Sequence, residues 1–497
     1  MLVDYAYENP YPTNFGLNTV TDPRNITIQI QHNLIEMPDN DYQPRFEDPR
    51  IGYFTTQVTD QTSKSMTPYR DLIHRWHLKK KDPSAAISEP VEPIVFWMEN
   101  TTPVELRPVI KKGVENWNMA FEKAGFKNAV VVKQQPDNAD WDAGDIRYNV
   151  LRWTSAPMMG SAWGPSFVNP RTGQILGADI MLDYVFIRGL YTTNKLFGVD
   201  AKSLDEMMFD HEEIYKTPHT HSYLCEAAHH KSEELMFGKY VGKALGYSEE
   251  QLNTLEEEMI IELLLHEVGH TLGLNHNFKS SQFRSPEEIN NKELTSKTGL
   301  TGSVMDYNPF NLAMDKESQG QFQSTVPGPY DLWAIEWGYT PEESSAEATQ
   351  MKLDKILSRS TEPELVFGND ADAMGFPGMG IDPTIIRWDM SSDVIKYGQD
   401  RIALSKKTMT GLKELFSEDG KSHHELVVGY ATIMNNYFGA LNLMKQYVGG
   451  VKINRAMNGQ ESTDKPFTPV DYQTQKRAMN ALITYGFSPD AFMTNND

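Results

Sequence analysis

One stretch of eleven residues decides the fold, and it reads HEVGHTLGLNH at positions 266–276. Residues four apart lie on the same face of a helix, so His266 and His270 direct both imidazoles at one point. Gly273 lets the chain leave the helix through a turn that a Cβ would obstruct. The turn returns His276 as a third nitrogen ligand.

Three imidazoles at this spacing suit a zinc ion. Three protein ligands leave the fourth tetrahedral position to water, which is typical of a catalytic site and not of a closed structural one. Glu267 lies beside the ion without being a ligand. The five fixed positions would occur by chance at most on the order of 10⁻⁴ times in such a chain. The sequence therefore predicts one catalytic Zn²⁺ ion on His266, His270 and His276.

The composition excludes several classes of protein. A chain of 497 residues suggests two to four domains, and 46 Lys+Arg against 68 Asp+Glu give a net charge of −22. That charge repels phosphate backbones, so we expect no nucleic-acid partner. No apolar run approaches the roughly 18 to 20 residues of a membrane span, and we expect none. The single cysteine, Cys225, cannot form an internal disulfide.

The pattern along the chain predicts an α+β protein with three regions. We expect a β-rich N-terminal segment over 1–90, a central region over 91–341 with a polar helical insertion at about 185–250, and a mainly helical region over 342–497. A charged, Pro-punctuated stretch before residue 94 marks the first boundary.

Within the central region, strands and helices alternate as in a twisted mixed sheet. The patterns predict strands at 94–98, 129–132, 146–153, 161–168 and 175–182, the last two joined as a hairpin by the turn 169–173. They predict helices from Thr102 to about Ala124, from about Glu249 to Leu272, and a core helix from Leu426 to Val448. Pro108 fits the first helix poorly, so that helix begins later or bends there.

A second motif, SVMDY at 303–307, follows the zinc signature. Together the two resemble the metzincin clan of zinc metallopeptidases. The resemblance implies that Met305 forms a hydrophobic base beneath the histidines, and that Tyr307 reaches toward the zinc and stabilises the oxyanion. It also implies a catalytic domain with a twisted mixed sheet, an antiparallel edge strand, an active-site helix and a Met-turn.

A finer resemblance is to a large bacterial family of mostly uncharacterised, metzincin-type zinc metalloproteases. The segments that carry it lie at 42–54, 169–175, 266–278, 303–307 and 329–339. Members of that family usually carry an export signal, whereas this chain opens without one, so we expect a trimmed piece of a secreted or periplasmic protein and not a cytoplasmic one.

The implied activity is endopeptidase hydrolysis of a peptide or protein substrate. Zinc-activated water attacks the peptide bond, with Glu267 as the general base and Tyr307 beside the oxyanion. The clan's layout places the antiparallel edge strand alongside an extended substrate. In this chain that strand is 161–168, and its candidate substrate-binding residues are Ser161, Ala162, Trp163 and Gly164.

Two other functions fit the same motifs. One is a binding or envelope protein that keeps zinc without turnover, although an intact Glu267 and Tyr307 argue against it. The other is a zinc amidase that acts on cell-wall peptides.

The acidic turn NDADAMG at 369–375 resembles half of a calcium loop, with an ordinary acidic turn as the simpler interpretation. Nothing in the sequence indicates an oligomeric state.

Overall fold

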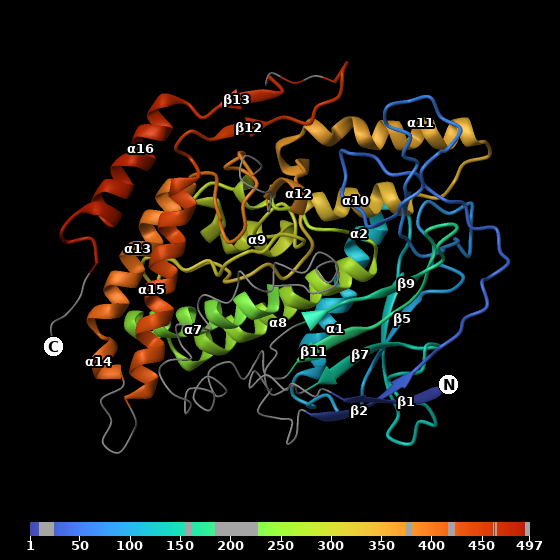
Figure 1. Ribbon diagram of the computed structural model, residues 1–497, viewed down its shortest axis with the longest axis horizontal. Coiled ribbons are helices and arrows are strands. Elements are labelled where there is room, and N and C mark those ends of the chain that lie inside the picture. Colours follow the sequence, from blue (N-terminus) through green and yellow to red (C-terminus); the bar gives the residue numbers. More distant parts are fainter. Residues whose placement is uncertain are drawn as a thin grey trace.

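Figure 1 shows the protein as a computed structural model. The structure describes residues 1–8, 24–154, 162–183, 227–373, 380–415, 423–460, 462 and 465–492. The strands of the first 183 residues gather on one side of the molecule and the C-terminal helices lie on the other, together with the two short strands after residue 450 (Figure 1). The long helix α8 (Glu249–Thr271) runs between them. The α+β class predicted from the sequence is confirmed.

The central sheet has five strands in the order β6-β5-β7-β11-β8. Their bounds are β5 Ile94–Met98, β6 Val130–Gln134, β7 Asn149–Thr154, β8 Ala162–Trp163 and β11 Ile180–Asp183. Neighbouring strands are parallel except for β8, which pairs antiparallel with β11. The predicted mixed sheet with an antiparallel edge strand is therefore present.

The predicted hairpin is divided between two sheets. The stretch 161–168 contains β8 and β9 (Ser166–Val168), and the stretch 175–182 contains β10 (Ile175–Ala178) and most of β11. Strands β9 and β10 pair with each other, whereas β8 and β11 belong to the central sheet. The two ladders separate beside Pro165, which has no N–H to donate, and Asp179, whose carboxylate accepts the backbone N–H of Val150 at 2.9 Å.

The first predicted helix begins later than Thr102. Helix α1 covers Arg107–Glu115 with a proline in its first turn, and α2 covers Asn118–Lys123. Proline lacks the N–H that an interior position would need, so it fits only at this start. The predicted start at Thr102 was therefore wrong, and the alternative of a later start is what forms, at Arg107 with Pro108 in the first turn.

Helix α8 begins with a capping box in which Ser248 Oγ accepts the N–H of Gln251 and the Gln251 side chain accepts the N–H of Ser248. From Met259 to Thr271 every residue of the helix is buried. Trp117, which lies between α1 and α2, donates its indole N–H to the carbonyl of Leu265 at 3.0 Å. The last two turns of α8 are thus enclosed by protein.

The C-terminal half is helical. It contains α13 (Val394–Thr410), α15 (His424–Lys445) and α16 (Tyr472–Leu482), which share a second core, and α7 (Ala227–Leu245) packs against α13 and α15. The expected core helix at Leu426 to Val448 corresponds to α15. One face of α15 is open, since Val427 and Phe438 are 50% and 45% exposed. The prediction of a core helix was therefore wrong for this face of α15.

The N-terminal segment contributes the hairpin β1 (Leu2–Glu8) and β2 (Asn25–Gln31) and the short pair β3 (Thr55–Thr56) and β4 (Leu72–Ile73). The main core extends from Ile51 through the sheet and α8 to Ile433. Both expected boundaries, near 90 and 341, fall within its span, and the division into three regions stays a prediction.

The other described elements are shorter. They are α9 (Lys292–Thr298), α10 (Pro329–Tyr339), α11 (Ala346–Leu357), α12 (Asp370–Ala373), α14 (Leu412–Leu415), β12 (Val451–Ile453), β13 (Phe467–Pro469) and the single turns η1 (Ser281–Phe283), η2 (Glu288–Asn290), η3 (Ser358–Thr361), η4 (Pro363–Leu365) and η5 (Ile483–Phe487). Within the part of the chain that the structure describes, no helix is both long and apolar enough to cross a bilayer.

Candidate metal centre

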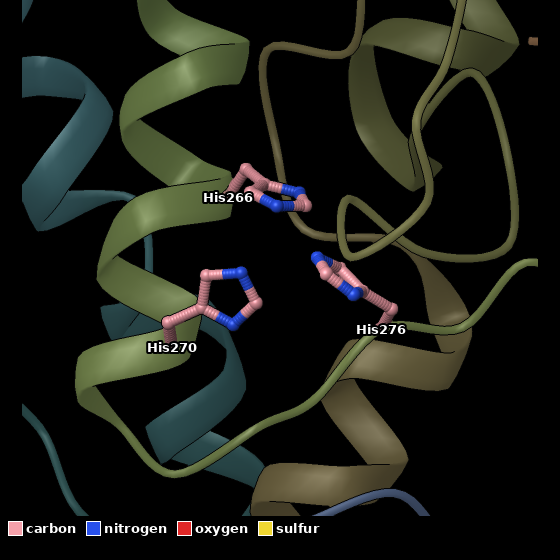
Figure 2. Close-up of side chains that lie close together, drawn as sticks. All are labelled: His266, His270 and His276. Atoms are coloured by element: carbon pink, nitrogen blue, oxygen red, sulfur yellow. The ribbon is translucent and has the colours of Figure 1, made fainter. Parts of the chain in front are cut away.

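Three imidazoles converge where α8 ends. His266 and His270 project from the last two turns of the helix, and His276 faces them from the loop that follows (Figure 2). One ligand nitrogen from each ring lies within 4.8 Å of the other two. Among the described residues, these histidines are the one group of three or more His, Cys, Asp or Glu with this spacing.

Each imidazole is oriented through its Nδ1 atom. The Nδ1–H groups of His266 and His270 donate to the carbonyls of Val304 at 2.8 Å and Leu274 at 2.9 Å. His276 donates its Nδ1–H to Asp370, whose two carboxylate oxygens lie at 2.9 and 3.0 Å. Since these acceptors fix the proton on Nδ1, the Nε2 lone pair is the one left for a metal.

The three rings fit zinc on two observations. The Nε2 atom of His276 is buried and has no hydrogen-bond partner among the described residues, as expected of a ligand atom. Burial, with the neighbouring rings, lowers the pKa of His266 well below its ordinary value and that of His270 to about 3. Both imidazoles are therefore neutral at pH 7, which is the form that binds metal.

The turn at Gly273 brings His276 back to the helix. Gly273 has φ +99°, and a Cβ at this position would lie 1.9 Å from the carbonyl oxygen of His74. The N–H of Phe54 donates to the Gly273 carbonyl at 2.7 Å, and the Phe54 ring lies 5.4 Å from the ring of His270. The N-terminal segment thus packs directly on the metal-binding loop.

Met305 packs against the turn of α8 that lies between His266 and His270. Its side chain is fully buried, and its sulfur is 2.2 Å from where a Cβ of Gly269 would be, on the helix turn between His266 and His270. A larger residue at position 269 would therefore displace the methionine.

The Met-turn is anchored by Asp331 of helix α10. This buried carboxylate accepts hydrogen bonds from Ser303 Oγ at 2.5 Å and from the N–H groups of Val304 at 2.9 Å and Gly328 at 2.7 Å. Burial raises the pKa of Asp331 to about 7, although the three hydrogen bonds that it accepts lower this pKa. The segment at 329–339 thus holds the turn that lies under the zinc ligands.

Tyr307 is buried beside the rings of His266 and His276. Its ring centroid lies 4.7 Å from that of His276 and 5.5 Å from that of His266. The ring of Trp388 stacks on that of Tyr307 at a centroid distance of 5.0 Å, and the backbone N–H of Trp388 donates to the Tyr307 carbonyl at 3.1 Å. Trp388 has φ +68°, a strained value for a tryptophan that surrounding contacts must hold in place.

Comparison with known families bears on this geometry. Residues 248–496, half of the chain, match the family model described as Met-zincin. The protein is a member of the Met-zincin family. A second model, described as a domain of unknown function, matches residues 8–81. Neither the curated proteins nor the solved structures gave a match.

Family membership and the triple-histidine centre support a zinc metallopeptidase in general terms. In this Met-zincin, the three predicted ligands, Met305 and Tyr307 lie together. Glu267 follows His266 on α8 and is fully buried.

The substrate strand predicted for this Met-zincin lies partly outside the described residues, because Ser161 is not among them. The backbones of Ala162 and Trp163 pair with those of Leu182 and Met181 at the edge of the central sheet. Gly164 packs on α8, where its Cβ position is 2.6 Å from the Glu267 carbonyl oxygen. The strand is therefore adjacent to the active-site helix.

Two partners of the metal centre were missed by sequence reasoning. Trp388 carries no motif that would connect it to Tyr307. Asp370 was visible only as part of the acidic turn at 369–375, which suggested calcium. In the structure Asp370 faces His276 and Asp372 pairs with Arg455. Calcium at this turn stays a prediction.

Proposed function

We propose that this Met-zincin is a zinc-dependent endopeptidase that hydrolyses peptide bonds in peptides or proteins. The observation that carries the proposal is the convergence of three imidazoles, each with its Nδ1 already bonded, beside the buried carboxylate of Glu267. A Zn²⁺ ion held by His266, His270 and His276 would polarise the scissile carbonyl and acidify a water molecule.

Two side chains of the protein would then transfer the proton and stabilise the negative charge that develops on the substrate. Glu267 takes the proton of the attacking water and delivers it to the leaving amine, as a general base and then a general acid. Its burial on α8 excludes competing bulk water. The Tyr307 hydroxyl donates to the tetrahedral oxyanion, and the stacked Trp388 restricts the phenol ring to that side of the histidines.

The edge strand would hold the substrate. Strand β8 ends the sheet order, so its outer edge has no partner strand among the described residues. An extended peptide would pair with this edge and lie along α8. We also propose, from the family resemblance, that the protein acts in the bacterial periplasm or outside the cell, and fractionation of cells that express the complete gene would test this.

The test is cleavage-site profiling of a peptide library with wild-type protein and the Glu267→Gln variant. We expect wild-type cleavage that a chelator abolishes, and a rate at least about 10² lower in the variant, since general-base catalysis contributes roughly 10² to 10⁴. Zinc content should be equal in both. Glu257→Gln, an exposed change on the same helix, is the matched control and should retain full activity.

Three results would contradict the proposal. Undiminished cleavage by Glu267→Gln would remove the general-base role. Zinc binding without cleavage of any peptide would favour a binding or envelope protein. Cleavage confined to cell-wall peptides would favour a zinc amidase.

A further inference from the structure

The third zinc ligand is held differently from the other two. The Nδ1–H groups of His266 and His270 donate to backbone carbonyls, which no side-chain substitution removes. His276 donates instead to a side chain, the carboxylate of Asp370, with both oxygens at 2.9 to 3.0 Å. His276 is therefore the ligand whose orientation depends on another residue's side chain.

His276 also needs more support than the other ligands. It lies beyond the end of α8, so no helical hydrogen bonds fix its backbone. Its side chain is 13% exposed, whereas His266 is fully buried. A half-turn of this imidazole about its Cβ–Cγ bond would put Cδ2 in the place of Nδ1 and Cε1 in the place of Nε2, and would turn the lone pair away from the other two rings. A fixed acceptor on Nδ1 prevents that rotation.

The segment that carries Asp370 is attached to the residues just after His276. The N–H of Phe278 donates to the Gly368 carbonyl at 2.7 Å, and the N–H of Gly368 donates to the Asn277 side chain at 3.2 Å. The same Asn277 side chain donates to the Val366 carbonyl at 2.9 Å. These bonds hold 366–370 against 277–278 and place the carboxylate at the imidazole.

We propose that Asp370 is a positioning residue of the metal centre. Its carboxylate keeps the proton of His276 on Nδ1 and presents Nε2 to the zinc, so that the region after residue 341 completes the site. This inference rests on the proposed function, because it takes His276 as a zinc ligand. Carboxylates that bond a ligating histidine typically contribute 10- to 100-fold to metal affinity.

The experiment compares Asp370→Ala, Asp370→Asn and the control Glu364→Gln in the full chain. Glu364 is a partly buried acid six residues earlier that does not bond the histidines. Zinc affinity is measured by competition with a chromophoric chelator, the ligand field by the visible spectrum of the Co²⁺-loaded protein, and folding by thermal unfolding of the metal-free protein.

We expect zinc affinity to fall by about 10- to 100-fold in Asp370→Ala. The fall should be smaller in Asp370→Asn, since the amide oxygen still accepts from Nδ1–H, and absent in Glu364→Gln. The Co²⁺ spectrum should change only in the Asp370 variants. The unfolding temperature of the metal-free protein should stay the same in all of them, because the role concerns the ligand and not the fold.

Wild-type affinity in Asp370→Ala would overturn the inference. So would an equal loss in Glu364→Gln, which would reflect charge alone, or a loss in both Asp370 variants that accompanies unfolding of the metal-free protein. The proposed function fails separately: if zinc binds and depends on Asp370 but no peptide is cleaved, the positioning role stands without the protease. If wild-type protein binds no zinc, both fail.

Discussion

Gly273 is the residue on which the geometry of the third ligand depends. Its φ of +99° lies in the region that other residues avoid, and the carbonyl of His74 occupies the space where a side chain would begin. Two independent constraints thus require glycine at this position, one from the backbone and one from packing. A substitution must move either the N-terminal segment or the loop that carries His276.

We therefore expect Gly273→Ala to lower the free energy of unfolding by about 2 to 4 kcal/mol, from backbone strain and the displaced His74. Zinc affinity should fall with it, because His276 moves. Urea unfolding and chelator competition measure the two effects. Gly439→Ala is the control, since this exposed helix position has open space around it and should gain about 0.5 to 1 kcal/mol. Equal stability of Gly273→Ala and wild type would contradict the argument.

At the scale of single residues, the sequence predicted the features that depend on spacing along a short segment. The helical repeat and one glycine specify that His266, His270 and His276 converge. It could not predict Asp370, which lies 94 residues from His276 and meets it only in the folded chain. An acidic turn that faces calcium and one that faces an imidazole have the same composition, so the contact could not be inferred from 369–375 alone.

Among the elements, helix α10 shows how the N-terminal segment is tied to the core. A helix leaves its last carbonyls without partners. At the end of α10 the buried guanidinium of Arg45 donates hydrogen bonds to these carbonyls. It reaches the carbonyl oxygens of Trp337, of Gly338 at 2.8 Å and of Thr340 at 3.0 Å. Burial lowers the pKa of Arg45 only to about 10, so the guanidinium stays charged at pH 7.

Arg45→Met should cost about 2 to 4 kcal/mol of unfolding free energy, because three buried carbonyls lose a charged donor. Urea unfolding followed by circular dichroism measures the change. Arg70→Met, an exposed arginine of the same segment, is the control and should stay within about 0.5 kcal/mol of wild type. An equally small effect of Arg45→Met would show that water molecules donate hydrogen bonds to these carbonyls in place of the guanidinium.

The elements that carry a strong local pattern were predicted well, and the failures have tertiary causes. Strand 94–98 and helix α8 lie where periodicity and capping place them. The stretch 161–168 divides because a single run of β-formers cannot show which sheet each half joins. The open face of α15 was missed because its apolar side chains predict burial whether or not a neighbour covers them.

Across the whole molecule, a buried pair of acids joins the Met-turn to the C-terminal half. Asp306 accepts from Ser280 Oγ at 3.1 Å, and Asp389 accepts from Ser281 Oγ and the Gln282 side chain at 2.8 Å each. Burial raises the pKa of both carboxyls, that of Asp389 to about 7, and the charge of Asp389 raises that of Asp306 further.

These raised pKa values predict a pH dependence. Between about pH 4 and 7 the folded protein binds more protons at this pair than the unfolded chain does, so the pair's contribution to stability is present at low pH and is lost as pH rises through about 7. Asp389→Asn should flatten this loss by up to about 3 kcal/mol between pH 5 and 8, at about 1.4 kcal/mol per pH unit up to the pKa of about 7. Urea unfolding of metal-free protein at both pH values tests it. Parallel pH profiles for the two proteins would refute the assignment.

The bond between His276 and Asp370 has a consequence for the order in which the chain is made. The ribosome synthesises the zinc-signature helix and its loop before Asp370, which lies 94 residues after His276 and orients it. Until Asp370 has been made, the Nδ1–H of His276 lacks the carboxylate that accepts from it in the folded protein. The metal centre can therefore reach its full arrangement only after residue 370 has been made, later in synthesis than the helix that carries its first two histidines.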